Sequence, residues 1–263
     1  MEREKAKYKL GLVLSGGGAR GFAHIGVLKA LNEAGIYPDI ISGVSAGSIV
    51  GAFYADGFSP DEILEIFSDH RFFNYMELIF PKRGLLKITG LLRVITQHLR
   101  SKTFEELKVP LIISATDLIE GKTVYFSEKD LPKAIIASSS IPVLFTPIEM
   151  NGSIYVDGGV LNNLPVEPIK TLCKILIGVH VNPTGKQLIL KSLANVAERS
   201  FHLSIATNVK HNAAQCDFFI ELKELSNYGV FDISKAKEMV EIGYQYTKKN
   251  FIESIKKKYG SLL

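Results

Sequence analysis

The chain has 263 residues, of which 46% are hydrophobic and 22% are charged, and it carries a formal net charge of +4. These proportions are close to those of ordinary globular proteins, so they exclude a disordered chain, and the length is sufficient for one large α/β domain. The positive charge is mild and forms no basic stripe interleaved with aromatic residues, so we expect no nucleic-acid partner.

The N-terminal part of the chain alternates apolar runs with helical patterns. Residues 8–15 predict a buried strand, and residues 22–35 predict a helix that ends at Gly35, a residue suited to a helix C-terminus. Residues 39–44 predict a second strand, and residues 46–57, which are rich in small side chains, predict the next helix. A further helix starts at Ser59, which has proline after it and glutamate three residues on, the pattern of a capping box.

The rest of the chain continues this alternation after a less regular, aromatic-rich and amphipathic stretch over residues 70–100. The expected elements are two strands around Gly121 within 109–128, a helix over 130–140, a hairpin over 148–159 that turns at Asn151-Gly152, a strand over 173–181, a helix over 193–215, a strand over 216–222 and one closing helix over 234–258. This order predicts an α/β fold with a mainly parallel sheet and helices on both faces. Without repeats or a linker, we expect a single domain over residues 1–263.

The cysteines and the apolar runs bear on the compartment. Cys173 and Cys216 are too few for a disulfide framework, so we expect two free thiols in a reducing environment. Residues 1–18 lack the apolar core of a secretory signal, and no run reaches the roughly 20 apolar residues of a membrane span. We therefore expect a cytoplasmic protein, with peripheral contact to a membrane as an open alternative.

A glycine-rich turn follows the first predicted strand. Gly16, Gly17 and Gly18 present successive backbone N–H groups at a helix N-terminus, an arrangement that binds a phosphate or an oxyanion. The same turn fits the dinucleotide pattern Gly-x-Gly-x-x-Gly, which expects an acidic residue at the end of the second strand. Asp39 precedes that strand and Ser45 ends it, so the dinucleotide interpretation is disfavoured.

Ser45 lies between the second strand and a helix, in the pattern Gly-x-Ser-x-Gly. A serine on such a turn has a strained backbone and an exposed hydroxyl, and the close approach of the chain requires Gly43 and Gly47. The helix N-terminus also favours developing negative charge. The sequence therefore predicts Ser45 as a nucleophile.

Two residues are candidates for the base that takes the proton of Ser45. His180 ends a strand and follows Ser45 and Asp157 in the chain order of a Ser-Asp-His triad. Asp157 itself lies on a tight turn before two glycines, where burial would make it more basic and allow a Ser-Asp dyad. The residues do not rank the dyad against the triad. The other histidines lack neighbouring motif residues: His24, His70, His98, His202 and His211.

Four motifs together resemble the patatin-like phospholipase family, in the form of a short, single-domain bacterial member. They are Gly-Gly-Gly-Ala-Arg-Gly at 16–21, Gly-Val-Ser-Ala-Gly at 43–47, Ala-Ser-Ser-Ser-Ile-Pro at 137–142 and Asp-Gly-Gly at 157–159. They occur in the family's order within about residues 8–168, and the remainder of the chain would complete a three-layer α/β/α fold. The resemblance implies hydrolysis of phospholipids, lysophospholipids or other lipid acyl esters, without metal or other cofactor.

The resemblance also implies roles for individual residues. Ser45 would be the nucleophile and Asp157 the general base, without a catalytic histidine. The backbone amides of Gly16, Gly17 and Gly18 would form the oxyanion hole. Arg20 would order that loop, while Gly43 and Gly47 would support the serine turn. Residues 70–100 would line an acyl channel or form a lid, with core packing as the alternative.

Two other functions remain open at this point. A Ser45–Asp157–His180 triad would make the protein an esterase of another type. A catalytically silent relative would bind an acyl chain or a phosphate without turnover, although an intact serine, aspartate and glycine turn disfavour this.

Overall fold

The computed structural model describes residues 6–68, 89–142, 144–183, 185 and 193–260. The strands within these residues are β1 (Tyr8–Leu14), β2 (Ile40–Val44), β3 (Leu111–Asp117), β4 (Lys122–Phe126), β5 (Ile148–Met150), β6 (Ser153–Asp157), β7 (Cys173–His180) and β8 (Phe218–Glu221). The α-helices are α1 (Phe22–Glu33), α2 (Ala46–Ala55), α3 (Pro60–Ser68), α5 (Thr89–His98), α6 (Leu131–Ser138), α7 (Leu193–Ala213), α8 (Ala236–Asn250) and α9 (Ile252–Gly260). Short 3-10 helices are η2 (Gly18–Gly21), η3 (Phe104–Glu106), η4 (Gly158–Val160), η5 (Lys223–Asn227) and η6 (Ile233–Lys235).

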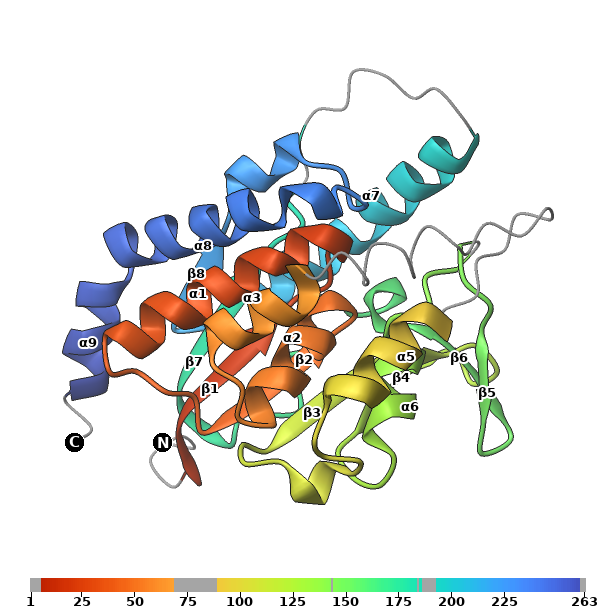
Figure 1. Ribbon diagram of the computed structural model, residues 1–263, viewed down its shortest axis with the longest axis horizontal. Coiled ribbons are helices and arrows are strands. Elements are labelled where there is room, and N and C mark those ends of the chain that lie inside the picture. The colour runs from red at the N-terminus through yellow and green to blue at the C-terminus, as the bar shows by residue number, and fades with distance from the viewer. Residues whose placement is uncertain (1–5, 69–88, 143, 184, 186–192, 261–263) are drawn as a thin grey trace.

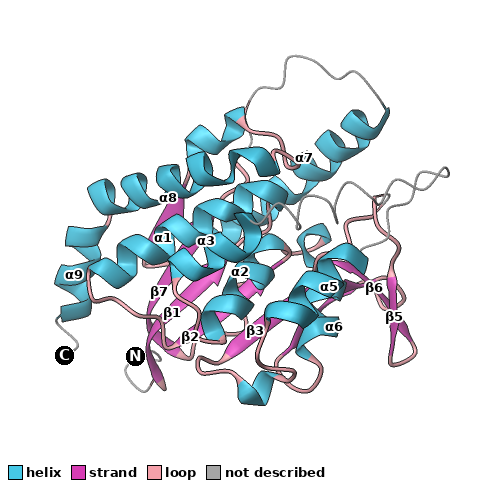
Figure 2. Cartoon of the chain, in the orientation of Figure 1, coloured by secondary structure: helices cyan, strands magenta, loops and turns pink. Residues whose placement is uncertain are grey.

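The strands form one mixed sheet in the order β5-β6-β3-β2-β1-β7-β8, with β4 paired to β3 off this path. Strands β3, β2, β1, β7 and β8 run parallel, whereas β4 and β6 are antiparallel to β3 and β5 is antiparallel to β6. The helices lie on both faces of this sheet (Figures 1 and 2). The predicted three-layer α/β/α fold with a mainly parallel sheet is therefore confirmed.

Successive side chains of β1 point to opposite faces of the sheet, and an apolar cluster covers each face. Leu10, Leu12 and Leu14 point into the larger apolar cluster, which includes side chains of α1, α2, α3 and α8. Val13 points to the opposite face, where it packs with side chains that include Val209 of α7. Both faces of this strand are thus buried over residues 10–14, which explains why this part of β1 carries no polar side chain.

Local sequence signals predict several turns and caps correctly. Gly35 adopts φ +74° just after α1, and the hairpin of β5 and β6 turns at Asn151 (φ +54°) and Gly152 (φ +79°). The Ser59 amide donates to a carboxylate oxygen of Glu62 at 2.7 Å, as the capping box requires. These positions carry the residues that such backbone conformations favour.

One predicted element is wrong, and one lies outside the described residues. The closing helix is two helices, because Phe251 (φ −125°, ψ −30°) leaves helical geometry between α8 and α9. The aromatic-rich run at 71–80 lies within residues 69–88, which are outside the described part, whereas residues 89–98 of the amphipathic run form α5. Among the residues described, no helix combines the length and the apolarity needed to cross a membrane. The single domain over residues 1–263 stays a prediction.

Candidate active site

Ser45 occupies the turn between β2 and α2 with φ 52° and ψ −124°. This conformation is unfavourable for a residue with a Cβ atom, and such strain is typical of a functional serine between a strand and a helix. A Cβ atom on Gly43 would lie 2.7 Å from the carbonyl oxygen of Gly47, and one on Gly47 would collide with the carbonyl oxygen of Leu14. The two glycines therefore permit the turn, as the sequence predicts.

Backbone hydrogen bonds hold Ser45 in this conformation. Its amide donates to the Ser138 hydroxyl oxygen at 2.8 Å. Its carbonyl oxygen accepts from the amide of Ser48 at 2.9 Å and from the hydroxyl of Ser48 at 2.7 Å. The backbone N–H group of this strained residue is thus hydrogen-bonded to α6, and its carbonyl group to the first turn of α2.

The sheet register brings Asp157 to Ser45. Strand β2 ends at Val44, which pairs with Ser114 of β3, and β6 ends at Asp157, which pairs with the next residue, Ala115. Strand β4 pairs with residues 113–117 along one edge of β3, so β2 and β6 both pair with the opposite edge. Because β2 is parallel to β3 and β6 is antiparallel, these two strands run toward each other. Their ends meet, and the residue after Val44 is Ser45.

Asp157 is 3% exposed, and its carboxyl group has an unusual pKa. Burial raises its pKa to about 6 from an ordinary 3.8, and this rise is partly offset by hydrogen bonds from the Ser45 side chain and from the Gly159 amide. The Gly159 amide lies 2.8 Å from Oδ1, and the Asp157 amide itself donates to the Ser140 carbonyl oxygen at 2.9 Å. The result is a fixed carboxylate, more basic than usual, that accepts from the Ser45 hydroxyl.

The glycine turn before η2 lies against the same serine. A Cβ atom on Gly16 would lie 3.1 Å from Cβ of Ser45, and Gly18 adopts φ +58°. Among the described residues, no acceptor is paired with the amides of Gly16, Gly17 or Gly18. Backbone N–H groups without a described acceptor, in a turn that packs against the serine, can bind an oxyanion, which is the role that the resemblance implies.

Arg20 ties this turn to two distant segments. Its Nε donates to the Tyr228 carbonyl oxygen at 2.8 Å, and its Nη1 donates to Oδ1 of Asn182 at 2.5 Å. The next turn residue toward the N-terminus, Ala19, donates from its amide to the Val230 carbonyl oxygen at 2.8 Å. Arg20 thus connects the turn to the segments after β7 and η5, consistent with an ordering role.

His180 does not join Ser45 and Asp157. It ends β7, which lies beyond β1 from β2, and its ring stacks on Phe219 with centroids 6.2 Å apart. Burial, followed by the effect of the nearby His24, lowers the pKa of His180 to about 4. Its Nδ1 has no hydrogen-bond partner among the described residues, so no contact orients it toward the carboxylate of Asp157.

His24 is likewise buried and structural. Its Nε2 lies 2.9 Å from the carbonyl oxygen of Ser15, at the start of the glycine turn. Burial lowers the pKa of His24 to about 4, so at neutral pH the ring is uncharged and Nε2 carries the proton that Ser15 accepts. His98 and His211 lie at the ends of α5 and α7, and neither lines the cavity described next.

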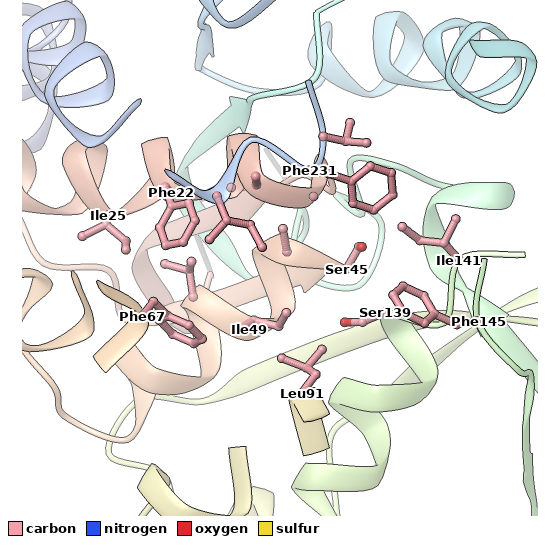
Figure 3. Close-up of a pocket in the computed structure, with 17 residues that line it drawn as sticks. Phe22, Ile25, Ser45, Ile49, Phe67, Leu91, Ser139, Ile141, Phe145 and Phe231 are labelled. Carbon is pink, nitrogen blue, oxygen red and sulfur yellow. The ribbon is translucent and has the colours of Figure 1, made fainter. Parts of the chain in front are cut away.

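Ser45 opens onto a cavity of about 130 Å³. Its lining is formed by small and apolar residues with two serines: Gly18, Ala19, Gly21, Phe22, Ile25, Ser45, Ala46, Ile49, Val50, Phe67, Leu91, Ser139, Ile141, Phe145, Val230, Phe231 and Ile233. Figure 3 shows Phe22, Ile25 and Phe67 to one side of Ser45, with Ile141, Phe145 and Phe231 to the other. This space suits an apolar chain attached to a group that reacts at Ser45.

Sequence reasoning missed three contributors to this site. Ser138 and Ser139 belong to the Ala-Ser-Ser-Ser-Ile-Pro motif, which indicated the family but no role for its hydroxyls. Oδ1 of Asn163 lies 2.5 Å from where a Cβ atom on Gly16 would be and 2.9 Å from where one on Gly159 would be, so Asn163 packs between the glycine turn and the turn after Asp157. The described residues contain no group of three or more His, Cys, Asp or Glu side chains placed to hold a metal ion.

Comparison with known proteins decides the family. The model of the family described as patatin-like phospholipase matches residues 12–170. The chain belongs to the patatin-like phospholipase family. An uncharacterized NTE-family protein of Mycobacterium tuberculosis is 36% identical over 184 residues, which cover 68% of this chain and 51% of that protein. Lysophospholipase NTE1 of Kluyveromyces lactis is 28% identical and covers 90% of this chain but 19% of the relative.

Solved structures agree on the fold of this patatin-like chain. VipD from Legionella pneumophila covers 94% of this chain and 67% of its own, with a TM-score of 0.56 and 16% identity. Human GIVD cytosolic phospholipase A2 covers 97% of this chain and 62% of its own, with a TM-score of 0.51 and 8% identity. At such identities the likeness concerns the fold alone. The chain spans about half the length of the mycobacterial relatives.

Proposed function

We propose that this patatin-like chain is a serine hydrolase of lipid acyl esters that works through a Ser45–Asp157 dyad. The observation that carries the proposal is the hydrogen bond from Ser45 to a buried carboxylate whose pKa is raised to about 6. A carboxylate of this basicity is still ionised at neutral pH and accepts a proton more readily than an ordinary aspartate. Nucleophile and base thus lie within hydrogen-bond reach.

The reaction proceeds through an acyl-enzyme. Asp157 accepts the hydroxyl proton as Oγ of Ser45 attacks the ester carbonyl carbon, and the negative charge on the carbonyl oxygen is stabilised by the amides of Gly16, Gly17 and Gly18. The bond to the alcohol then breaks, and the leaving oxygen takes the proton from Asp157. Water repeats the sequence on the acyl-serine, which releases the fatty acid and restores both residues.

The cavity supports lipid esters as the substrate class. Its apolar lining can hold an acyl chain while the ester lies at Ser45, as phospholipids, lysophospholipids and neutral acyl esters require. The Kluyveromyces lactis relative is named a lysophospholipase, which agrees with this class. Phe231, on the cavity wall, is 48% exposed. An exposed aromatic side chain beside the cavity supports peripheral contact of the protein with a lipid surface.

Hydrolysis of a short-chain nitrophenyl ester tests the dyad. Ser45→Ala and Asp157→Asn should each lower turnover by several orders of magnitude, on the order of 10³ to 10⁶, whereas His180→Ala should change it only modestly. Each variant is first compared with wild type by circular dichroism and thermal unfolding. A folded His180→Ala protein without activity would refute the dyad, and a wild type inactive on both short and long esters would refute hydrolysis.

A further inference from the structure

Three consecutive serines lie at the end of α6, and two of their hydroxyls have partners within the chain. Ser138 Oγ accepts from the Ser45 amide at 2.8 Å, and Ser140 Oγ donates to the Ile136 carbonyl oxygen at 2.8 Å. The hydroxyl of Ser139, whose residue is 5% exposed, has no partner among the described residues. A buried hydroxyl without a partner is unfavourable, so this one lacks the structural explanation that its neighbours have.

The location of Ser139 supplies an explanation. Ser139 lines the cavity at Ser45, and these two serines are the polar side chains among the described residues that line it (Figure 3). Around them the cavity wall is apolar, with Leu91 and Phe145 labelled near Ser139 in the same view. A bound substrate would therefore bring the hydrogen-bond partner that the protein does not provide.

The chemistry of the ester limits which substrate atom this can be, an inference that rests on the proposed hydrolysis. The carbonyl oxygen is assigned to the amides of the glycine turn, and an ordinary acyl chain carries no oxygen. The remaining oxygens belong to the alcohol half. We propose that Ser139 is a specificity-determining residue that donates a hydrogen bond to an oxygen of the alcohol half beside the scissile ester, so that glycerol esters are preferred over esters of simple alkanols.

Two esters that differ only in the alcohol test this preference. Glycerol 1-hexanoate and propyl hexanoate share the acyl chain and a three-carbon alcohol, but propanol lacks the neighbouring hydroxyls. Ser139→Ala should lower kcat/KM for the glycerol ester about 5- to 12-fold, mainly through KM, as expected for one hydrogen bond. The value for the propyl ester should stay within about twofold of wild type.

Two further variants control for structural effects. Ser114 of β3 also has a buried hydroxyl without a partner, but it does not line the cavity, so Ser114→Ala should leave both rates unchanged. Ser139→Thr keeps the hydroxyl and should restore the preference for the glycerol ester. Equal losses on both esters in Ser139→Ala, or no loss on either, would overturn the proposal. A third ester, propyl 2-hydroxyhexanoate, carries a hydroxyl group on its acyl half. If Ser139→Ala lowered kcat/KM for this ester alone, the proposal would be overturned, because the contact would then be with the acyl half.

A binding measurement separates this inference from the hydrolysis itself. The ether 1-O-hexylglycerol has the same alcohol half but cannot be hydrolysed, and its affinity for wild type and Ser139→Ala can be measured by calorimetry. Weaker binding to Ser139→Ala by about 5- to 12-fold would support the contact even if wild type hydrolysed neither ester. Equal affinities would overturn the contact even if hydrolysis were demonstrated.

Discussion

The carboxylate of Asp157 should make the folded protein less stable at neutral pH, and asparagine at this position tests that expectation. Burial raises its pKa from 3.8 to about 6. Each pKa unit corresponds to about 1.4 kcal/mol, so ionisation of the buried group costs about 3 kcal/mol of unfolding free energy above pH 6. Because the folded pKa is the higher one, the protein has this unfolding free energy of about 3 kcal/mol in full below pH 3.8 and loses it as the pH rises through about 6.

Asp157→Asn removes the charge and keeps the shape of the side chain. Its amide oxygen can still accept from the Gly159 amide, which lies 2.8 Å from Oδ1 in the native protein. We expect the free energy of unfolding at neutral pH to rise by up to about 3 kcal/mol, or about 5 °C in Tm, while activity is lost. Near pH 4 the variant and wild type should be about equally stable.

Urea titrations at neutral pH and near pH 4 measure both differences, provided that the slopes agree between variant and wild type. Asp61→Asn is a matched control, because that side chain is 73% exposed and its ion pair with Lys29 lies at the surface, so its loss should change stability little at either pH. A destabilised Asp157→Asn protein, or a stability difference that does not depend on pH, would show that the cost of burying the charge is not the dominant effect.

Wild-type kinetics provide an independent check on the same pKa. Protonated Asp157 cannot accept the proton of Ser45, so kcat/KM should fall about tenfold for each pH unit below about 6. The acid limb should be the same for two esters with different leaving groups. A limb near pH 4 would contradict a buried, basic carboxylate in the free protein.

The remaining predictions concern the surroundings of the dyad. Gly47→Ala should abolish activity and lower Tm, because its methyl group would collide with the Leu14 carbonyl oxygen; a variant with wild-type kinetics would contradict the close approach. Ser138→Ala should cost about 1–3 kcal/mol in urea unfolding and lower kcat, since the strained Ser45 amide loses its acceptor. Phe67→Ala should enlarge the cavity on the side opposite Phe145 and shift the preferred nitrophenyl ester toward longer chains, with Phe104→Ala, outside the cavity, leaving that preference unchanged.

Local sequence patterns were sufficient for most elements and for the two glycine-rich turns. Gly43 and Gly47 indicate the turn at Ser45 because no larger residue fits so close to the neighbouring backbone. Gly35 and Asn151 indicate a helix end and a hairpin because they tolerate positive φ. The apolar spacing of the sequence continues through Phe251, so it does not indicate the break between α8 and α9.

Contacts between distant segments decided the rest of the site. The sequence by itself supplied Ser45 and two candidate bases, Asp157 and His180, without ranking them. Only the tertiary structure shows that β2 and β6 meet along one edge of β3, whereas β1 separates β2 from β7. The physical reason is that two strand pairings, Val44 with Ser114 and Ala115 with Asp157, together bring Ser45 to a residue far along the chain. The register of both pairings is set by the whole sheet and the core on its two faces.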